Sequence, residues 1–177
     1  MVTIIFFCLG YGIFAITVHI VPHITDLQIS ATTAATILAT TGGIQAIGGI
    51  VLGGVADKIG NRRVLIISFI LISAAMFWLI PIRSVWVFYL FAIVYGLGVS
   101  GGGVMEPIIV AELFGIKSHG LILGVVSFVF TIGGAVGPLV TGYIFDLTGN
   151  YQLAFLLCAV LGIVAIILGT ILRPIQN

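Results

Sequence analysis

Charged side chains are rare in this sequence: only 6% of its 177 residues are Asp, Glu, Lys or Arg. A water-soluble domain carries about 25% charged residues. The apolar set of Ala, Val, Ile, Leu, Met, Phe, Trp, Tyr and Cys makes up 61% of the chain. Most of the surface must therefore face lipid, which excludes a water-soluble domain, and no basic patch indicates nucleic-acid binding.

Cysteine and catalytic motifs are equally sparse. Cys8 and Cys158 lie in apolar runs at opposite ends of the chain, so we interpret them as small buried residues and not as a disulfide or metal pattern. No P-loop is present, which argues against direct use of ATP. The N-terminal apolar run lacks the basic segment and the cleavage site of a signal peptide. We expect a protein that is not an enzyme, with no cofactor, no metal site and no catalytic residues.

Long apolar runs are what the chain has in abundance. A membrane-spanning helix needs about 20 such residues. We expect Pro22 with Asp26 to end the first run, and residues 53–63 to form a short loop after the second. The sequence predicts an all-α membrane protein, a single domain of residues 1–177 whose six transmembrane helices lie near residues 2–21, 31–56, 64–80, 84–114, 118–145 and 151–172.

The placement of Lys and Arg predicts the orientation, because loops rich in these residues stay in the cytoplasm. In the six-helix topology Arg83 alone falls on one side of the membrane. The other five fall on the opposite side: Lys58, Arg62, Arg63, Lys117 and Arg173. Because the number of helices is even, we expect a multi-pass protein of the cell membrane with both termini in the cytoplasm.

Residues 53–63 carry the most specific motif of the chain. Their pattern resembles the loop signature of the major facilitator superfamily, Gly-x-x-x-Asp-Arg/Lys-x-Gly-Arg-Arg/Lys, although Asn61 stands where a basic residue is commoner. Any short cytoplasmic loop is basic, but charge alone does not explain the spacing of glycine and aspartate. We expect this loop to act as a conformational switch through Gly53, Asp57, Lys58, Gly60, Arg62 and Arg63.

The same pattern occurs twice. Gly-x-x-x-Asp-x-x-Gly-Asn begins at Gly53 and again at Gly142, 89 positions later, where its aspartate is Asp146. Three predicted helices separate the copies, so they lie on opposite sides of the membrane. The sequence therefore predicts an inverted repeat of three helices plus three, typical of secondary transporters, with units of about residues 1–82 and 83–177.

Polar side chains inside the predicted helices are candidates for solute binding, because polar groups in lipid are costly. His19 has an alternative role as an interfacial histidine wetted by headgroup water, and Gln45 has one in helix packing. With His23, His19 would make only a weak zinc pair, because Pro22 disturbs the helix between them. The candidates for substrate binding are Tyr11, His19, Gln45, Tyr95 and Glu106.

Glu106 is also the candidate for proton coupling, because it is the acidic residue that we place within a membrane span. The glycines at 101–103 before it and Pro107 after it predict a loosened helix, which the membrane tolerates only beside protein or a water-filled cavity. The alternative is that Glu106 pairs with Arg62 or Lys117 and fixes the cytoplasmic end of its helix.

Glycine is frequent in the second and fifth predicted helices and indicates close helix contacts. In the second helix we expect such contacts at Gly42, Gly49 and Gly53. In the fifth helix we expect a packing and hinge segment formed by Gly133, Gly134, Gly137, Pro138 and Gly142, which leads to Asp146. The sixth helix is apolar all round and is expected to be peripheral and lipid-facing.

Almost the whole chain resembles the C-terminal six-helix half of a major facilitator transporter, and within it the branch of monocarboxylate transporters and oxalate–formate antiporters. The resemblance is carried by residues 19–22, 53–63, 111–115, 133–138 and 145–155, with Asp26 and Ser30. It implies a twelve-helix fold with a substrate cavity between two halves, lined here by the first and fourth helices. One departure is Gly49, which stands where that branch often has an arginine that binds a carboxylate.

The sequence thus predicts half of a secondary active transporter that moves a small polar solute, such as a monocarboxylate, by alternating access, coupled to a proton or to a counter-solute. Its expected partners are the lipid bilayer, the solute, and an N-terminal six-helix half that is missing or supplied by a second chain. The alternatives are a non-transporting membrane scaffold or subunit and, less favoured, an intramembrane enzyme.

Overall fold

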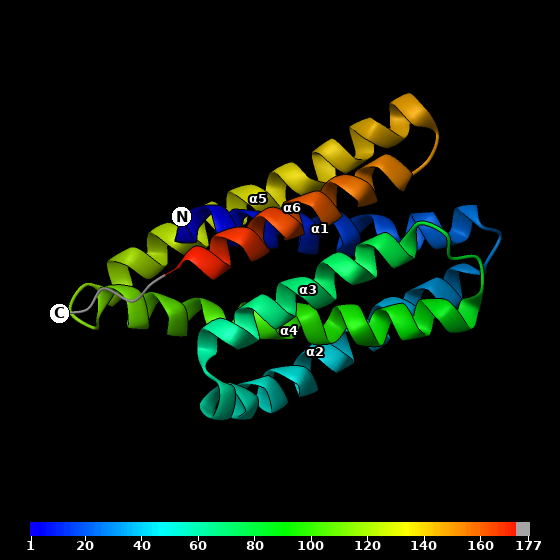
Figure 1. Ribbon diagram of the computed structural model, residues 1–177. Coiled ribbons are helices and arrows are strands. Elements are labelled where there is room, and N and C mark those ends of the chain that lie inside the picture. The colour runs from blue at the N-terminus through cyan, green and yellow to red at the C-terminus, as the bar shows by residue number, and fades with distance from the viewer. Residues whose placement is uncertain (173–177) are drawn as a thin grey trace.

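The computed structural model describes residues 1–172, so Arg173, one of the five cations that predict the orientation, lies outside the described residues. The described chain is all-α, as predicted (Figure 1). It forms six helices in the order α1 (Val2–Asp26), α2 (Ala31–Ile59), α3 (Asn61–Leu79), α4 (Val85–Phe114), α5 (His119–Thr148) and α6 (Gln152–Ile171).

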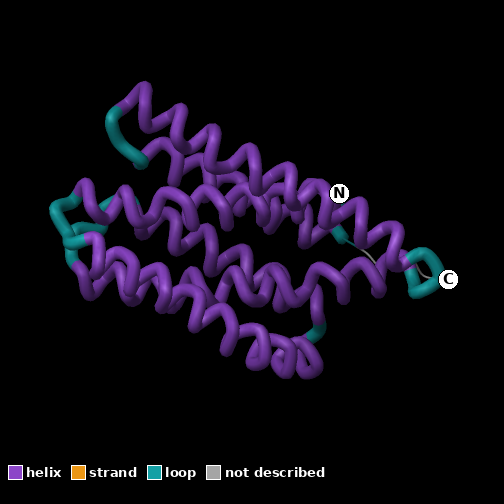
Figure 2. Tube along the Cα trace, turned by 180° about the vertical axis from the view of Figure 1, so that it is seen from behind, coloured by secondary structure: helices purple, strands orange, loops and turns teal. Residues whose placement is uncertain are grey.

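All six helices are long and apolar enough to cross a membrane. They run side by side in one elongated bundle, and successive helices run in opposite directions (Figures 1 and 2). Met1 therefore lies at the same end of the bundle as the α2–α3 and α4–α5 connections. The α1–α2, α3–α4 and α5–α6 connections lie at the other end, which we call the outer end.

The first helix was predicted to end near residue 21, because of Pro22 and Asp26. This boundary is wrong. Proline removes one backbone N–H, yet α1 continues through Pro22 for one further turn to Asp26. Such prolines persist in membrane helices because neighbouring groups cover the freed backbone. Gln28, with φ of 63°, then turns the chain, and the Ser30 hydroxyl accepts a hydrogen bond from the Thr33 N–H at 3.1 Å, which caps α2.

The predicted loop of residues 53–63 is almost entirely helical. α2 continues to Ile59 and α3 begins at Asn61, so Gly60 alone breaks the helix, with φ of 93°. The positive φ of this turn suits glycine, which has no Cβ to clash with the backbone. Gly149, the corresponding glycine of the second motif copy, also has a positive φ of 69° at the end of α5.

Helix contacts follow the three-plus-three arrangement. α1 packs against α5 and α6, α4 packs against α2 and α3, and α3 packs against α6. Exchanging the first three helices for the last three leaves this pattern unchanged. α2 and α5 lie at opposite margins of the bundle and expose much of their length, whereas α1 and α4 are central (Figure 1).

The closest helix contact joins α1 and α5 and depends on glycine. A methyl group at Gly133 would meet the backbone carbonyl of Phe7, and one at Gly137 would meet the carbonyl of Tyr11. On the α1 side, a methyl group at Gly10 would meet the carbonyl of Phe130. The two backbones therefore touch without intervening side chains, as expected for small residues in membrane helices.

The prediction of a loosened fourth helix is wrong, because α4 is continuous from Val85 to Phe114. The low helix propensity of its glycines is offset by close packing against the neighbouring helices. A methyl group would lie 3.0 Å from the Thr41 carbonyl at Gly96 and 3.0 Å from the Ser68 carbonyl at Gly98. The helix is held by its neighbours α2 and α3, so the weak helix propensity of glycine does not decide its conformation.

Two of the three close contacts predicted for α2 are absent within the described residues. Nothing lies within 4 Å of a methyl group built at Gly42 or Gly53, and at Gly49 the nearest atom belongs to Val104 at 3.4 Å. The contact of α2 with α4 falls instead at Gly48, against Ser100. Glycine content alone could not show which of these residues faces a neighbour.

Gly137→Ala is expected to lower the free energy of unfolding by about 1–3 kcal/mol, because the new methyl group meets a backbone carbonyl that moves only if the helix moves. Gly12→Ala is the matched control: Gly12 is also buried, next to Tyr11, but nothing lies within 4 Å of its added methyl group. Thermal denaturation in detergent, followed by circular dichroism, measures both. Equal midpoints for the two variants would contradict the glycine contact.

Candidate functional site

The five predicted solute-binding residues do not converge on one site. Tyr11 and Tyr95 are buried in the bundle, and Glu106, half-buried, makes a contact between α4 and α5. His19 contacts the outer part of α5, and Gln45 lies half-buried on α2. These residues therefore belong to separate local arrangements.

His19 bridges α1 to the outer part of α5 and α6. Its Nε2 lies 3.1 Å from the carbonyl of Pro138, and its Nδ1 lies 3.4 Å from the hydroxyl of Tyr151. A carbonyl only accepts, so Nε2 carries the proton and Nδ1 of a neutral ring accepts from the tyrosine. The ring also lies over Gly142, where a methyl group would come within 3.6 Å. His19 is thus held by hydrogen bonds within the bundle.

The two tyrosines belong to the interior of the bundle. Tyr95 stacks on Phe91 with ring centroids 5.2 Å apart and donates a hydrogen bond to the Gly12 carbonyl at 3.3 Å. The buried hydroxyls of Tyr11 and Thr141 lie near each other, but neither has a partner at full hydrogen-bond geometry among the described residues. Such groups are costly unless a water molecule or a ligand meets them, so the core near Tyr11 is polar and incompletely satisfied.

Glu106 is linked to α5. The hydroxyl of Ser127 donates a hydrogen bond of 2.6 Å to its carboxylate, a short, charge-assisted contact between α4 and α5. Arg62, a cation considered as its partner, donates instead to the carbonyls of Gly169 and Thr170. The sequence did not indicate Ser127 as a partner of Glu106, because a serine in an apolar helix usually bonds to its own backbone.

The residues of the predicted switch divide into two groups. On α3, Arg62 Nε donates to the Gly169 carbonyl at 2.9 Å, and Asn61 donates to the carboxylate of Glu112 at 2.5 Å. These contacts tie the start of α3 to the ends of α6 and α4. On α2, Asp57 and Lys58 are exposed at the end of the helix, so their side chains are free to meet something outside the described chain.

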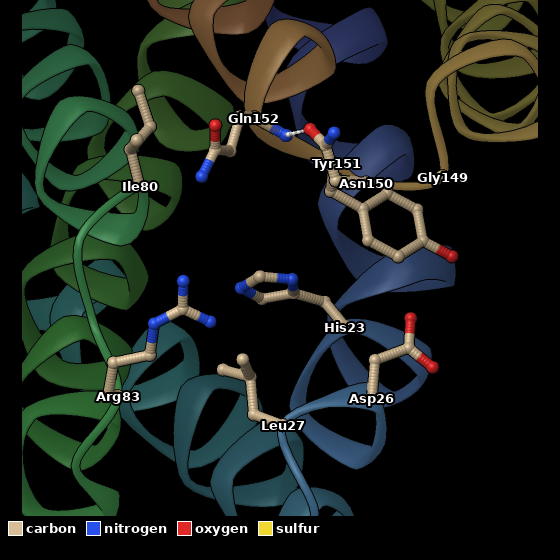
Figure 3. A pocket seen from close by; sticks show the side chains of 9 residues that line it. All are labelled: His23, Asp26, Leu27, Ile80, Arg83, Gly149, Asn150, Tyr151 and Gln152. Carbon is tan, nitrogen blue, oxygen red and sulfur yellow. Dashed lines mark hydrogen bonds between the residues drawn. The ribbon is translucent and has the colours of Figure 1, made fainter.

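The outer end holds a cavity of about 210 Å³ (Figure 3). Residues from α1 and from the α3–α4 and α5–α6 connections line it. The ring of His23 packs edge-on against Phe88, Tyr151 and Phe155 at its aromatic side. The remaining lining residues are Asp26, Leu27, Ile80, Arg83, Gly149, Asn150 and Gln152.

Tyr151 contacts several other rings at the outer end. Its ring stacks on Phe145 at 4.4 Å and on Phe155 at 5.7 Å, and it lies beside both His19 and His23. Burial raises the pKa of its phenol above the usual value, and the carboxylates of Asp26 and Asp146 raise it further. The hydroxyl therefore stays protonated and remains a donor to His19. In the sequence, Phe145 and Tyr151 flank the second motif copy.

Metal ligands do not gather in the described part of the chain. No group of three or more His, Cys, Asp or Glu side chains there could hold a metal ion. Both ring nitrogens of His19 are occupied by the hydrogen bonds described above.

Comparison with protein families gives one match over nearly the whole chain: the profile described as Major Facilitator Superfamily matches residues 2–177. The chain is 29% identical over 169 residues to an uncharacterized MFS-type transporter, YcxA, of Bacillus subtilis, covering 91% of this chain and 41% of the relative. It is 28% identical over 154 residues to monocarboxylate transporter 12 of Rattus norvegicus, covering 85% of this chain and 32% of the relative. The chain thus spans well under half the length of these relatives.

Solved structures show the same fold. A crystal structure of the peptide transporter POT in complex with sulfate superposes with a TM-score of 0.84 at 19% identity, covering 96% of this chain and 36% of that one. The six helices therefore correspond to one part of a larger transporter fold. The predicted resemblance to this superfamily, and to its monocarboxylate transporters, is confirmed.

Arg62→Gln is expected to loosen the last turn of α6, because the guanidinium no longer binds its terminal carbonyls. Losing contacts of this kind costs about 1 kcal/mol, so amide exchange at residues 166–171 should accelerate about fivefold in hydrogen–deuterium exchange. Arg63→Gln, an exposed neighbour, is the control and should leave α6 unchanged. Unaltered protection of α6 in Arg62→Gln would rule out this anchor.

Proposed function

Because this chain belongs to the major facilitator superfamily, we propose that it is the C-terminal six-helix half of a secondary active transporter that moves a small polar solute by alternating access. The chain is a multi-pass membrane protein, and its relatives and fold are those of transporters and not of enzymes. We also propose a second six-helix half, a class of solute, a residue that couples a proton to transport, and an orientation in the membrane.

Glycines of α2 and α5 that have no neighbour in the described chain support the proposal that a second half is needed. Methyl groups built at Gly42, Gly43, Gly53 and Gly54 of α2 meet nothing within 4 Å. On α5 the same holds for Gly120 and Gly124. Glycine gains nothing from facing lipid, whereas it permits close approach of another helix. We infer that α2 and α5 receive the helices of the N-terminal half, encoded in the same reading frame or supplied by a second chain.

The length of the relatives supports the same inference. The match to the Bacillus subtilis relative includes 91% of this chain but only 41% of the relative. The match to the rat relative includes only 32% of that protein. In the solved transporter it covers 36% of the chain. A second half of comparable size would complete such a protein and would place the substrate cavity between the two halves.

A small organic anion, such as a monocarboxylate, is the solute class that we propose. The similarity to a protein named monocarboxylate transporter 12 supports it. Gly49 supplies no cation where an arginine would bind the carboxylate, and a methyl group built at Gly49 would lie 3.4 Å from Val104. A cationic side chain that binds the carboxylate of the solute must therefore come from the other half or from another part of the chain.

Glu106 is the residue that we propose to couple a proton to transport. It is half-buried and bound to Ser127 across the α4–α5 contact, so a change in the packing of these helices changes its environment. As a carboxylate it accepts the serine hydrogen bond, and as a carboxylic acid it becomes a donor. Movement of α4 against α5 would then favour one protonation state in each conformation.

Asp57 and Lys58 are proposed to act on the conformational exchange. Both are exposed at the inner end of α2, close to the open glycines Gly53 and Gly54, and would face the second half. Arg62 instead anchors α6 within this half. The motif would thus combine a fixed part on α3 with a part on α2 that makes and breaks contacts during each cycle.

The orientation proposed is a cell-membrane protein with both termini in the cytoplasm. Lys58, Arg62, Arg63 and Lys117 lie at the end of the bundle that holds Met1, and Arg83 lies at the outer end. This asymmetry follows the positive-inside rule.

Glu106→Gln tests the coupling in the longest protein that contains this chain, reconstituted in liposomes with labelled L-lactate as probe. We expect exchange of lactate down its own gradient to persist, while accumulation driven by a pH gradient falls at least tenfold, because the amide cannot release a proton. Asp57→Asn is the contrast: slower exchange, by about tenfold, with the same final accumulation. If Glu106→Gln accumulates lactate as well as the parent, Glu106 is not the coupling residue. If the parent does not transport lactate at all, the proposed solute is wrong.

A further inference from the structure

We propose that the outer cavity is a separate binding site for a short-chain carboxylate, held between Arg83, Gln152 and His23. This site lies entirely within the described residues and does not involve Glu106 or the exposed faces of α2 and α5. It therefore stands independently of the transport proposal.

Three nitrogen-bearing side chains face one space. The guanidinium of Arg83, the side-chain amide of Gln152 and one edge of the His23 ring point into the cavity from three different segments (Figure 3). The hydrogen bond marked among these lining residues joins the Gln152 backbone N–H to Asn150 Oδ1, at 3.1 Å. No hydrogen bond is drawn between the side chains of Arg83, Gln152 and His23 themselves (Figure 3).

His23 supplies the sharpest sign of an absent partner. Its Nε2 is buried and has no hydrogen-bond partner among the described residues. Its ring is held edge-on by Phe88, Tyr151 and Phe155, so it cannot swing out to water without breaking those contacts. An unpaired buried ring nitrogen is costly, and an acceptor in the cavity would relieve that cost if Nε2 carries the proton.

The outer end carries the cation Arg83 and the carboxylates of Asp26 and Asp146, so an anion is suited only to the part of the cavity beside Arg83. Among the described residues Arg83 is the one Lys or Arg at the outer end, and its planar guanidinium matches the two oxygens of a carboxylate. Asp26 also lines the cavity, but its carboxylate points away from Arg83, on the far side of the His23 ring (Figure 3). The cation is therefore available to a ligand.

The size and the walls select a short ligand. A cavity of about 210 Å³ is smaller than the roughly 300–1,000 Å³ of sites for drug-sized molecules. Leu27 and Ile80 form an apolar part of the wall, which suits an alkyl group beside the carboxylate. A short-chain monocarboxylate satisfies both parts, whereas an inorganic anion leaves the apolar part unused.

Acetate is the probe for this site. The longest protein that contains this chain is placed in lipid nanodiscs, and acetate is titrated by calorimetry at constant ionic strength, with chloride as the exchanged anion. We expect saturable binding in the parent and at least tenfold weaker binding in Arg83→Gln. Lys117→Gln, the same change at the opposite end of the bundle, is the matched control and should bind within twofold of the parent.

His23→Phe tests the buried nitrogen without removing the ring contacts. We expect it to bind acetate at least threefold more weakly than the parent while keeping the parent's melting temperature. If that variant does not fold, Arg83→Gln, a change at an exposed connection, decides the question alone. Unsaturable binding in the parent, parent-like affinity in Arg83→Gln, or equal binding of chloride would overturn the proposal.

Lactate exchange measured on the same preparations separates this site from the transport path. We expect Arg83→Gln to lose acetate binding and keep lactate exchange. If exchange is lost together with binding, the cavity belongs to the transport path and is not a separate site. If the parent binds acetate saturably with the same Arg83 dependence but does not transport lactate, the site stands and the proposed function fails.

Discussion

Close approach of helix backbones is the constraint on which this structure depends. In lipid, apolar side chains gain little by leaving their surroundings, so helices associate through packing of small residues and through hydrogen bonds. At Gly133 and Gly137 the backbone of α5 touches that of α1 with no space for a methyl group. The contacts of α4 at Gly96 and Gly98 serve the same purpose against α2 and α3. These contacts set the relative positions of the helices that carry the polar residues.

Once the helices are close, their polar groups largely satisfy one another. The His19 ring bonds to a carbonyl of α5, the Tyr95 hydroxyl to a carbonyl of α1, and Arg62 to the last carbonyls of α6. Each bond joins segments far apart in the sequence. The polar groups that remain unsatisfied, such as Nε2 of His23, are therefore informative, because a membrane protein gains nothing by burying them alone.

Hydropathy and turn chemistry predicted the fold well, because helix number depends on apolar length and a positive φ at Gly60 needs glycine. The end of α1 was missed because local rules treat Pro22 as a stop, while packing carries the helix past it. The site was predicted only in part. Sequence position marked Glu106 as unusual, but its partner Ser127 depends on how α4 meets α5, and that register is a tertiary property.

The central claim is that this chain is one half of a transporter whose cavity requires a second half. The most direct test compares the 177-residue chain, reconstituted in liposomes as a demonstrated monomer, with the longest protein that contains this chain, or with this chain co-expressed with a second six-helix half. The measured quantity is saturable uptake of labelled small carboxylates and sugars. The account predicts no saturable uptake by the monomer and uptake by the combined halves. Robust saturable uptake by the monomer alone would contradict it.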